Sequence, residues 1–230
     1  GTPQGGPLSP LLANLLLDDL DQELERRGHK FCRYADDCNI YVQSPAAGER
    51  VLSSVTKFLE GRLKLRVNRE KSAAAPVEER KFLGHRLLPD GTLTIAPKSL
   101  DRAKDRVREI TRRNRGVRFE RMIGELNSFL RGWVAYFRHA KAKAVLTALG
   151  SWVRRKLRCV RLKQRKRAKA IADFLSSLGI GRDQRWTAAA SGKGWWRLSH
   201  HPVVQQAMNN AWFQSQGLID PLERYLELQH

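Results

Sequence analysis

Residues 34–37, which read Tyr34-Ala35-Asp36-Asp37, decide how the rest of this chain is interpreted. Apolar runs flank them on both sides, at 31–32 and 40–42, so the tetrapeptide is predicted to form the turn of a tight β-hairpin. Such a turn holds two adjacent carboxylates at one rigid point. Hard cations such as Mg²⁺ prefer oxygen ligands, and converging carboxylates are typical of metal-assisted phosphoryl transfer. Four residues are a weak signal alone, and a solvated Asp-Asp turn is the alternative.

Three further blocks surround this hairpin in a fixed order. Residues 1–10 contain Pro3-Gln4-Gly5 and lead into a helical pattern, for which Ser9 is the expected N-cap and Pro10 a first-turn residue. Downstream come residues 68–71, Asn-Arg-Glu-Lys, and residues 82–85, Phe-Leu-Gly-His. The four blocks together resemble the second half of the palm of reverse transcriptases. Their forms look most like those of the proteins encoded by group II introns.

The second part of the chain is predicted to be helical almost throughout. Ser99 is expected to cap one helix, and a second helical pattern runs from Met122 to Phe137. Within it, residues 126–137 are similar to the maturase-specific segment of group II intron proteins, which forms a helical thumb and assists splicing of the intron RNA. The alternative, that aromatic residues such as Trp133 simply pack in the core, is compatible with this interpretation.

These patterns predict an α+β fold in two parts. Residues 1–96 are expected to form the C-terminal part of a reverse transcriptase palm, with β-hairpins and packed helices. Residues 81–88 and 92–95 are predicted to form its second hairpin, around a turn at 89–91. Pro97 marks the boundary, and residues 97–230 are expected to form a helical thumb and maturase-specific domain with a C-terminal extension.

The charge of the chain indicates a polyanionic partner. Lys and Arg number 43 against 23 Asp and Glu, which gives a formal net charge of +20. Such an excess favours rapid association with phosphate backbones. The excess is concentrated in residues 154–169, which contain no acid, and an apolar stripe from Val153 to Leu175 predicts one continuous helix through them. We expect this helix to contact RNA through ten residues: Arg154, Arg155, Lys156, Arg158, Arg161, Lys163, Arg165, Lys166, Arg167 and Lys169. A merely solvated charged face is the alternative.

The resemblance implies roles for individual residues. Asp36 and Asp37 match the catalytic carboxylates that hold Mg²⁺, and Asp36 is the stronger candidate of the two. Gln4 and Gly5 match the element that lines the nucleotide and template pocket. Lys71 matches a lysine suited to contact the triphosphate or protonate the leaving pyrophosphate, although an ordinary surface lysine is the alternative. The hairpin that supports the primer end is matched by Phe82, Leu83 and Gly84.

The resemblance also implies the activity and partners of the parent protein. They are those of an RNA-directed DNA polymerase and intron maturase with a two-ion Mg²⁺ site, which binds group II intron RNA, an RNA template, a DNA primer and dNTP. Because that site needs another aspartate from an earlier palm strand, we expect the chain to be the C-terminal part of a longer enzyme that also has fingers. The isolated chain is expected not to extend a primer. The alternative function is an RNA-binding splicing cofactor without polymerase activity.

Other functional classes find little support in the sequence. The three cysteines, Cys32, Cys38 and Cys159, form no Cys-x-x-Cys pair, so neither a zinc ribbon nor a disulfide framework is indicated, and a reducing cytoplasm is expected. No apolar run approaches the length that crosses a membrane. The aspartates at positions 18, 19 and 21 are assigned to the polar face of their helix rather than to the metal site.

Overall fold

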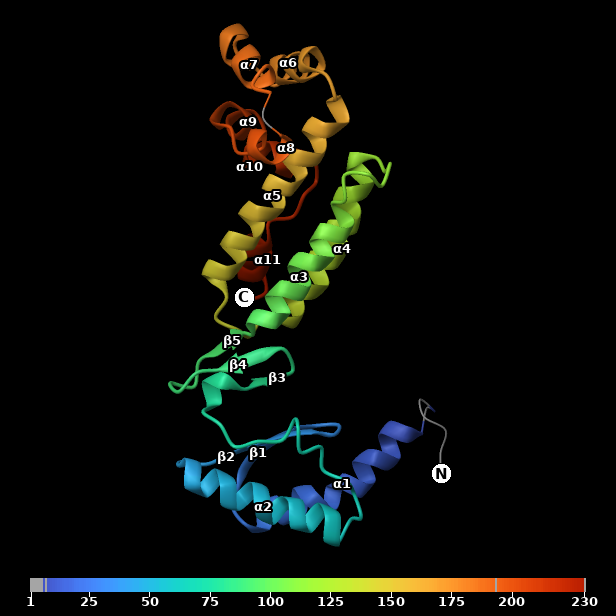
Figure 1. Ribbon diagram of the computed structural model, residues 1–230, viewed down its shortest axis with the longest axis vertical. Helices are drawn as coiled ribbons and strands as arrows, with labels where there is room; N and C mark the ends of the chain where they lie inside the picture. The colour runs from blue at the N-terminus through green and yellow to red at the C-terminus, as the bar shows by residue number, and fades with distance from the viewer. Residues whose placement is uncertain (1–5, 7, 193, 230) are drawn as a thin grey trace. The chain divides into compact units, whose positions relative to one another are not determined.

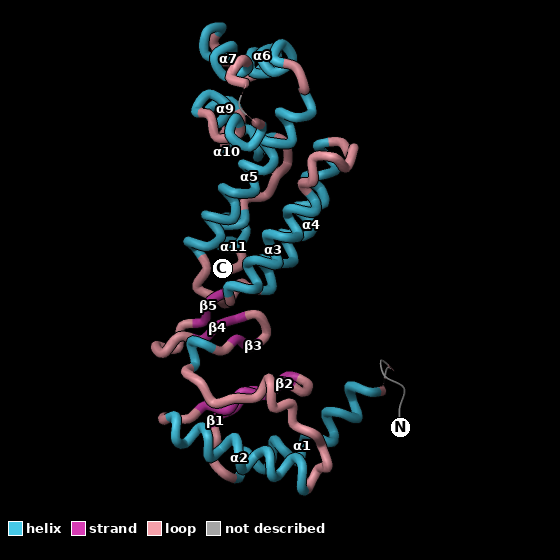
Figure 2. Tube along the Cα trace, in the orientation of Figure 1, coloured by secondary structure: helices cyan, strands magenta, loops and turns pink. Residues whose placement is uncertain are grey.

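The structure of the chain is a computed structural model that describes residues 6, 8–192 and 194–229. Its fold is α+β, as predicted: Figure 2 shows helices throughout and only short strands. The chain divides into two compact units, Gly1–Gly91 and Thr92–His230, and each is described by itself. The functional domain boundary after residue 96 stays a prediction.

The first unit begins with a helix, a hairpin and a second helix (Figure 1). These are α1 (Ser9–Arg26), β1 (Lys30–Tyr34), β2 (Asp37–Tyr41) and α2 (Pro45–Gly61). The hairpin is antiparallel, with Lys30 opposite Tyr41 and Tyr34 opposite Asp37. Along β1 the exposed and half-buried residues alternate, as the period of a strand requires. Arg33 is one of the half-buried residues, and arginine is an unusual residue type for a covered strand face.

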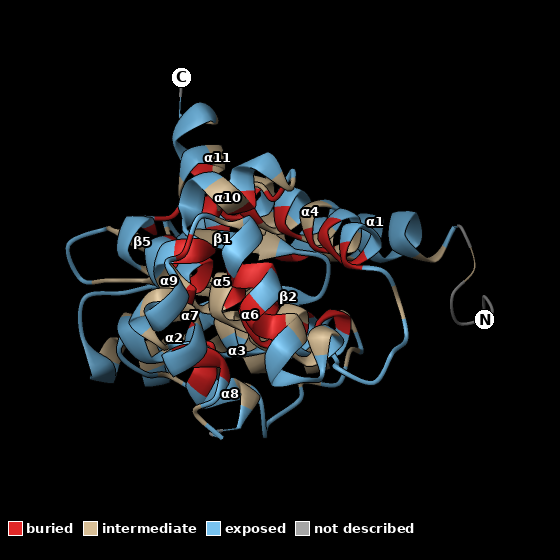
Figure 3. Cartoon of the chain, turned by 90° about the horizontal axis from the view of Figure 1, so that it is seen from above, coloured by how far each residue is buried: buried red, intermediate tan, exposed pale blue. Residues whose placement is uncertain are grey.

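One half of α1 is covered and the other is not. Leu20 and Leu24 are buried, whereas Leu11, Leu12, Leu15 and Leu16 are between 43% and 65% exposed. In Figure 3 the end of α1 nearest the N-terminus is accordingly pale blue. The apolar periodicity that predicts this helix therefore identifies the helix correctly but not the extent of its burial.

The second hairpin differs from its prediction. After the short helix η1 (Val77–Glu79), β3 (Lys81–Phe82) pairs with β4 (His85–Leu87) around a two-residue turn, Leu83 and Gly84. Both turn residues have positive φ, 49° and 77°. The predicted uninterrupted strand at 81–88 is therefore wrong, because this turn reverses the chain inside it. A turn at 89–91 does form, with the Gly91 N–H donating to the Leu88 carbonyl at 2.9 Å.

The second unit is built on long helices. After β5 (Leu93–Ile95) come α3 (Pro97–Ile110), α4 (Phe119–Tyr136) and α5 (Lys143–Arg165), and α11 (Pro221–Glu227) returns to pack on α4 and α5 (Figure 1). Shorter helices follow one another in the described sequence between α5 and α11: α6 (Ala168–Ser177), α7 (Arg182–Ala189), α8 (Trp195–Leu198), α9 (Pro202–Ala207) and α10 (Asn210–Ser215). Buried residues on the predicted stripes, such as Met122, Leu126 and Leu157, contribute to the main core.

Neither serine that was predicted to cap a helix is an N-cap residue. Pro lies in the first two positions of both α1 and α3, where its missing N–H is harmless and its fixed φ suits the helix. The N-cap residues are Leu8 and Ala96. The caps predicted at Ser9 and Ser99 are therefore wrong, since both serines already lie inside the helix.

The basic segment is not one continuous helix. α5 ends at Arg165, where Lys166 takes a positive φ of 62°, and α6 begins at Ala168. A left-handed residue cannot continue a right-handed helix, so the chain changes direction at this point. Ala168, which the apolar stripe placed in the core, is exposed as a result.

Candidate functional site

The turn of the first hairpin presents both candidate carboxylates to solvent. The register leaves Ala35 and Asp36 as the two turn residues, and Asp37 is the first residue of β2. Asp36 and Asp37 are both exposed, so they meet solvent from a rigid antiparallel ladder. Ala35 has a φ of 54°, a left-handed conformation that non-glycine residues rarely adopt. The hairpin predicted from the sequence is therefore present, with its carboxylates at the tip.

A residue that the sequence analysis missed braces this turn. The guanidinium of Arg33 in β1 donates from Nε to both Asp21 oxygens, at 2.8 and 3.0 Å, and from Nη2 to Asp21 Oδ2 at 2.5 Å. Its Nη1 donates to Asn14 Oδ1 at 3.1 Å and to the Ala35 carbonyl at 2.9 Å. Hydrogen bonding to Asp21 is the main reason why the pKa of Arg33 is raised. The sequence offered one signal of this role: in a strand, Arg33 lies on the same face as the apolar residue Phe31.

The donor set suits a hard divalent cation but supplies only part of a cage. Carboxylate oxygens are the ligands that Mg²⁺ takes in proteins, and Asp36 and Asp37 offer them side by side. Among the described residues, no group of three His, Cys, Asp or Glu side chains is placed to hold a metal ion. Asp18 and Asp21 are engaged on α1, where Asp18 accepts from Gln22 and Asp21 from Arg33. Further ligands would therefore have to come from substrate, water or another segment.

Lys71 lies on a loop that the side chain of Asn68 organises. Asn68 Oδ1 accepts from the backbone N–H groups of Glu70 and Lys71, each at 3.2 Å. The Asn68 carbonyl accepts from the Ser72 N–H at 3.0 Å. This turn leaves Lys71 exposed, which gives the Asn-x-x-Lys spacing a structural basis. Its role toward a triphosphate stays a prediction.

The structure describes only some of the other residues of the predicted site. Phe82 ends β3, and Leu83 and Gly84 form the turn before β4, so the predicted primer support is a tight hairpin. Gln4 and Gly5 lie outside the described residues.

Much of the predicted RNA-binding helix is used inside the protein. Arg158 is 7% exposed, donates from Nε to the Met208 carbonyl at 2.9 Å and stands 5.4 Å from the centre of the Phe213 ring. Arg161 lies over the rings of Phe119 and Phe174, and Arg165 lies 4.4 Å from the Phe174 centroid. Arg158, one of the ten residues expected to contact RNA, is thus covered by the protein itself. Arginine can pack against aromatic rings through its flat, weakly hydrated guanidinium, which hydrophobic patterning does not reveal.

Two more of the ten residues predicted to bind RNA make contacts within the second unit. Arg155 stacks 4.0 Å from the centre of the Trp196 ring, and Lys163 Nζ donates to the Arg113 carbonyl at 3.2 Å. Burial lowers the pKa of Lys156, and it lowers that of Arg158 to about 10, with a smaller contribution from Arg154. These residues therefore bear a desolvation cost that a freely solvated cation avoids.

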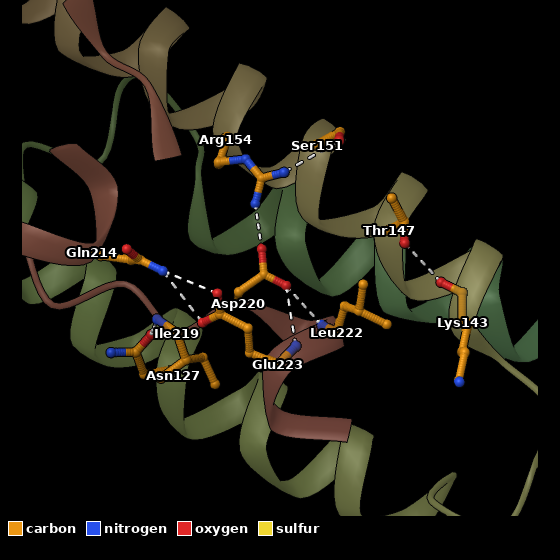
Figure 4. A network of polar contacts seen from close by, with 10 residues as sticks. All are labelled: Asn127, Lys143, Thr147, Ser151, Arg154, Gln214, Ile219, Asp220, Leu222 and Glu223. Atoms are coloured by element: carbon orange, nitrogen blue, oxygen red, sulfur yellow. Dashed lines mark hydrogen bonds and ion pairs between the residues drawn. The ribbon is translucent and has the colours of Figure 1, made fainter. Parts of the chain in front are cut away.

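Arg154 belongs to a polar network that fastens the C-terminal helix (Figure 4). Arg154 Nη1 donates to Asp220 Oδ2 at 2.6 Å, and Asp220 Oδ1 caps α11 by accepting from the Leu222 N–H at 2.8 Å. Nearby, Asn127 Oδ1 accepts from the Ile219 N–H at 3.0 Å. Arg154 is thus occupied in an ion pair whose two side chains are 12% and 19% exposed.

The exposed cations of the basic segment gather where α5 gives way to α6. Lys166, Arg167 and Lys169 are exposed, and they surround the break in the helix. Of the ten residues predicted to bind RNA, these three are the side chains that the structure leaves most accessible.

Comparisons with known proteins match both parts of the chain. Residues 1–87 match the family described as reverse transcriptase (RNA-dependent DNA polymerase), and residues 100–176 match the family described as group II intron, maturase-specific domain. The chain is also similar to Protein YkfC of Escherichia coli (strain K12), with 33% identity over 123 residues. That match covers 38% of this chain and 32% of YkfC, so the chain spans about a third of the length of this curated relative. Among the described residues, no helix is both long and apolar enough to span a bilayer.

Proposed function

Because the chain belongs to the reverse transcriptases and maturases encoded by group II introns, we propose that it supplies the metal-binding hairpin of the palm and the thumb of an RNA-directed DNA polymerase. The observation that carries this proposal is the pair of exposed carboxylates, Asp36 and Asp37, at the tip of a braced two-residue turn. Asp36 and Asp37 would hold Mg²⁺, which supplies charge stabilisation during phosphoryl transfer. A further carboxylate would come from a preceding palm strand.

The chain's own residues contribute positioning and charge. Lys71, held on the Asn68 turn, would neutralise the triphosphate of a dNTP and place a proton near the departing pyrophosphate. The turn at Leu83 and Gly84 would support the primer end, and Gln4 and Gly5 would line the pocket for nucleotide and template. The basic rim at Lys166, Arg167 and Lys169 would bind the phosphate backbone of intron RNA or of the template duplex.

The metal role is tested in the full-length protein by the substitution Asp36→Ala. Primer extension on an RNA template with Mg²⁺ should fall by about a thousandfold or more, because the cation loses its principal protein ligand, while RNA affinity should change less than about threefold. Glu25→Ala, which removes an exposed carboxylate from α1, is the matched control and should extend primers normally. Primer extension at the wild-type rate by the Asp36→Ala protein would contradict the metal assignment.

A second function, assistance of intron splicing, is favoured by the match of residues 100–176 to the maturase-specific domain. A maturase without polymerase activity would bind and stabilise folded RNA through the second unit alone. The Asp36→Ala protein separates the two functions, since splicing of the intron RNA should continue at its normal rate when DNA synthesis is abolished. Loss of both activities in a protein that still folds and binds RNA would count against separate functions.

A further inference from the structure

Arg33 occupies a position in which a charge needs partners. In β1 the residues on its side of the strand are half-buried, and its own side chain is 12% exposed. A covered guanidinium without hydrogen bonds would lose its hydration with nothing to replace it. Helix α1 supplies the partners: Asn14 and Asp21 are seven residues apart, which places them on the same face two turns apart. The strand and the helix are thus joined by one side chain.

The same guanidinium reaches the backbone of the turn. Arg33 Nη1 donates to the Ala35 carbonyl, the oxygen of the peptide unit whose nitrogen belongs to Asp36. Ala35 stands at a φ of 54°, so the turn holds a conformation that alanine does not favour by itself. A hydrogen bond to that carbonyl, from a group anchored on α1 by Asp21, restricts rotation of the peptide plane. Through Arg33, the direction in which the Asp36 side chain leaves the backbone then depends on contacts with α1.

We propose that Arg33 is a positioning residue for the metal-binding carboxylates, which ties the peptide unit before Asp36 to Asp21 and Asn14 of α1. The inference rests on the proposed function, because it gives Arg33 a role toward the metal that Asp36 and Asp37 would hold. Arginine is required here because its planar fork serves a carboxylate, an amide oxygen and a backbone carbonyl together. Lysine offers three donors at a single atom and cannot span these positions.

The test uses the full-length protein, as for Asp36→Ala, and two readouts. Amide hydrogen exchange is measured by NMR across residues 34–38, and Mn²⁺ is titrated as a paramagnetic probe that broadens the amide signals of Asp36 and Asp37. In Arg33→Lys and Asp21→Asn, exchange in the turn should accelerate about tenfold, as expected for the loss of a hydrogen bond to a charged group. The Mn²⁺ concentration for half-maximal broadening should rise about tenfold, the usual effect of removing a group that orients a metal ligand.

Two controls separate positioning from general destabilisation. Arg27→Lys alters another arginine of the first unit, whose hydrogen bonds go to Glu23 and Ser54 rather than to Asp21 or the turn. This variant should leave both readouts at wild-type values. Exchange in α2 is followed in every variant. Arg33→Gln is the more severe change, and if it unfolds the unit, Arg33→Lys and Asp21→Asn still decide the question because each keeps a polar side chain in place.

The outcomes distinguish this inference from the proposed function. In one outcome, Mn²⁺ broadens the Asp36 and Asp37 signals in the wild type, and neither variant changes the exchange rates or the Mn²⁺ response. This result would overturn the positioning role but not the metal site. Absence of broadening in the wild type would overturn the proposed metal site and with it the role of Arg33. Faster exchange and weaker Mn²⁺ response confined to the Arg33 and Asp21 variants would support both.

Discussion

At the scale of single residues, the same amino acid serves different purposes in different surroundings. Arg33 and Arg158 are both largely covered, yet one orients a turn and the other satisfies the Met208 carbonyl. Arginine can do either because its aliphatic carbons pack against other side chains while its guanidinium N–H groups donate hydrogen bonds in fixed directions. Burial of an arginine therefore has to be interpreted through its acceptor: a turn carbonyl beside Asp36 indicates a function, and a carbonyl at the end of α9 indicates structure.

Trp133 is expected to contribute to folding of the second unit rather than to contact RNA directly. Its ring lies 4.8 Å from that of Phe137, and it packs against both apolar clusters of the second unit. Trp133→Ala should lower the free energy of unfolding by about 3 kcal/mol, within the range for truncation of large core side chains. Thermal unfolding monitored by circular dichroism measures this destabilisation. A variant with wild-type stability that no longer binds RNA would instead identify Trp133 as a surface stacking residue.

At the scale of elements, ion pairs form near the ends of helices in both units. Near the end of α1, the Glu23 carboxylate accepts from Arg26 and Arg27, and Arg27 also donates to Ser54 of α2 at 3.1 Å. The hydrogen bond from Arg26, followed by that from Arg27, lowers the pKa of Glu23 to about 2. The group is thus more acidic in the folded chain than at its ordinary value of 4.5.

This shift predicts a pH dependence of stability. A carboxylate whose folded pKa is depressed contributes stability above its unfolded pKa and loses it as the pH falls through the folded value. Wild type should therefore be more stable than Glu23→Gln at pH 7, and the difference should disappear between about pH 4.5 and pH 2. Urea midpoints measured across this range provide the test, with the exposed Glu25→Gln as the control. A difference that stays constant down to pH 2 would exclude the linkage.

The C-terminal helix provides a second prediction at this scale. Asp220 both caps α11 and pairs with Arg154, so its two functions can be removed one at a time. Asp220→Asn keeps a capping oxygen and should cost about 1 to 2 kcal/mol, the value of a partly covered charged hydrogen bond. Asp220→Ala should cost about 1 kcal/mol more, because it also removes the cap.

Denaturant unfolding of both variants measures this difference. Arg224→Gln, which breaks the more exposed pair with Glu227, is the control and should shift stability by less than about 0.5 kcal/mol. Equal stability of the Asn and Ala variants would mean that the cap contributes nothing to the docking of α11.

At the scale of the whole molecule, the net charge of +20 favours a polyanion, but many cations of the basic segment are not available to it. Five of its arginines form an ion pair, lie over an aromatic ring or are buried: Arg154, Arg155, Arg158, Arg161 and Arg165. RNA binding should therefore depend on Lys166, Arg167 and Lys169. Their replacement by Gln should reduce the slope of log affinity against log salt by about 0.7 to 0.9 for each phosphate that the variant no longer neutralises.

RNA dissociation constants at several salt concentrations measure this effect. A triple Gln variant at Lys57, Lys64 and Arg66, exposed cations of the first unit, changes the net charge equally and should retain more of the salt dependence. Arg158→Gln should act first on stability, because it leaves the Met208 carbonyl with a poorer donor. Identical salt plots for the wild type and the Lys166, Arg167 and Lys169 variant would leave the α5–α6 rim as a charged surface without an RNA partner.

The sequence alone determined the α+β class, the tight hairpin at residues 34–37 and the helical second part. These depend on local alternation, helical periodicity and turn chemistry, which act between residues close along the chain. The tertiary structure decided which charged residues face inward. Asp21 and Arg33 are twelve positions apart and Arg154 and Asp220 sixty-six, and no period encodes such a pairing. Whether an arginine stabilises the fold or is available to RNA can be decided only when its hydrogen-bond acceptors are known. The free energy of burying its guanidinium depends on the partner that replaces water.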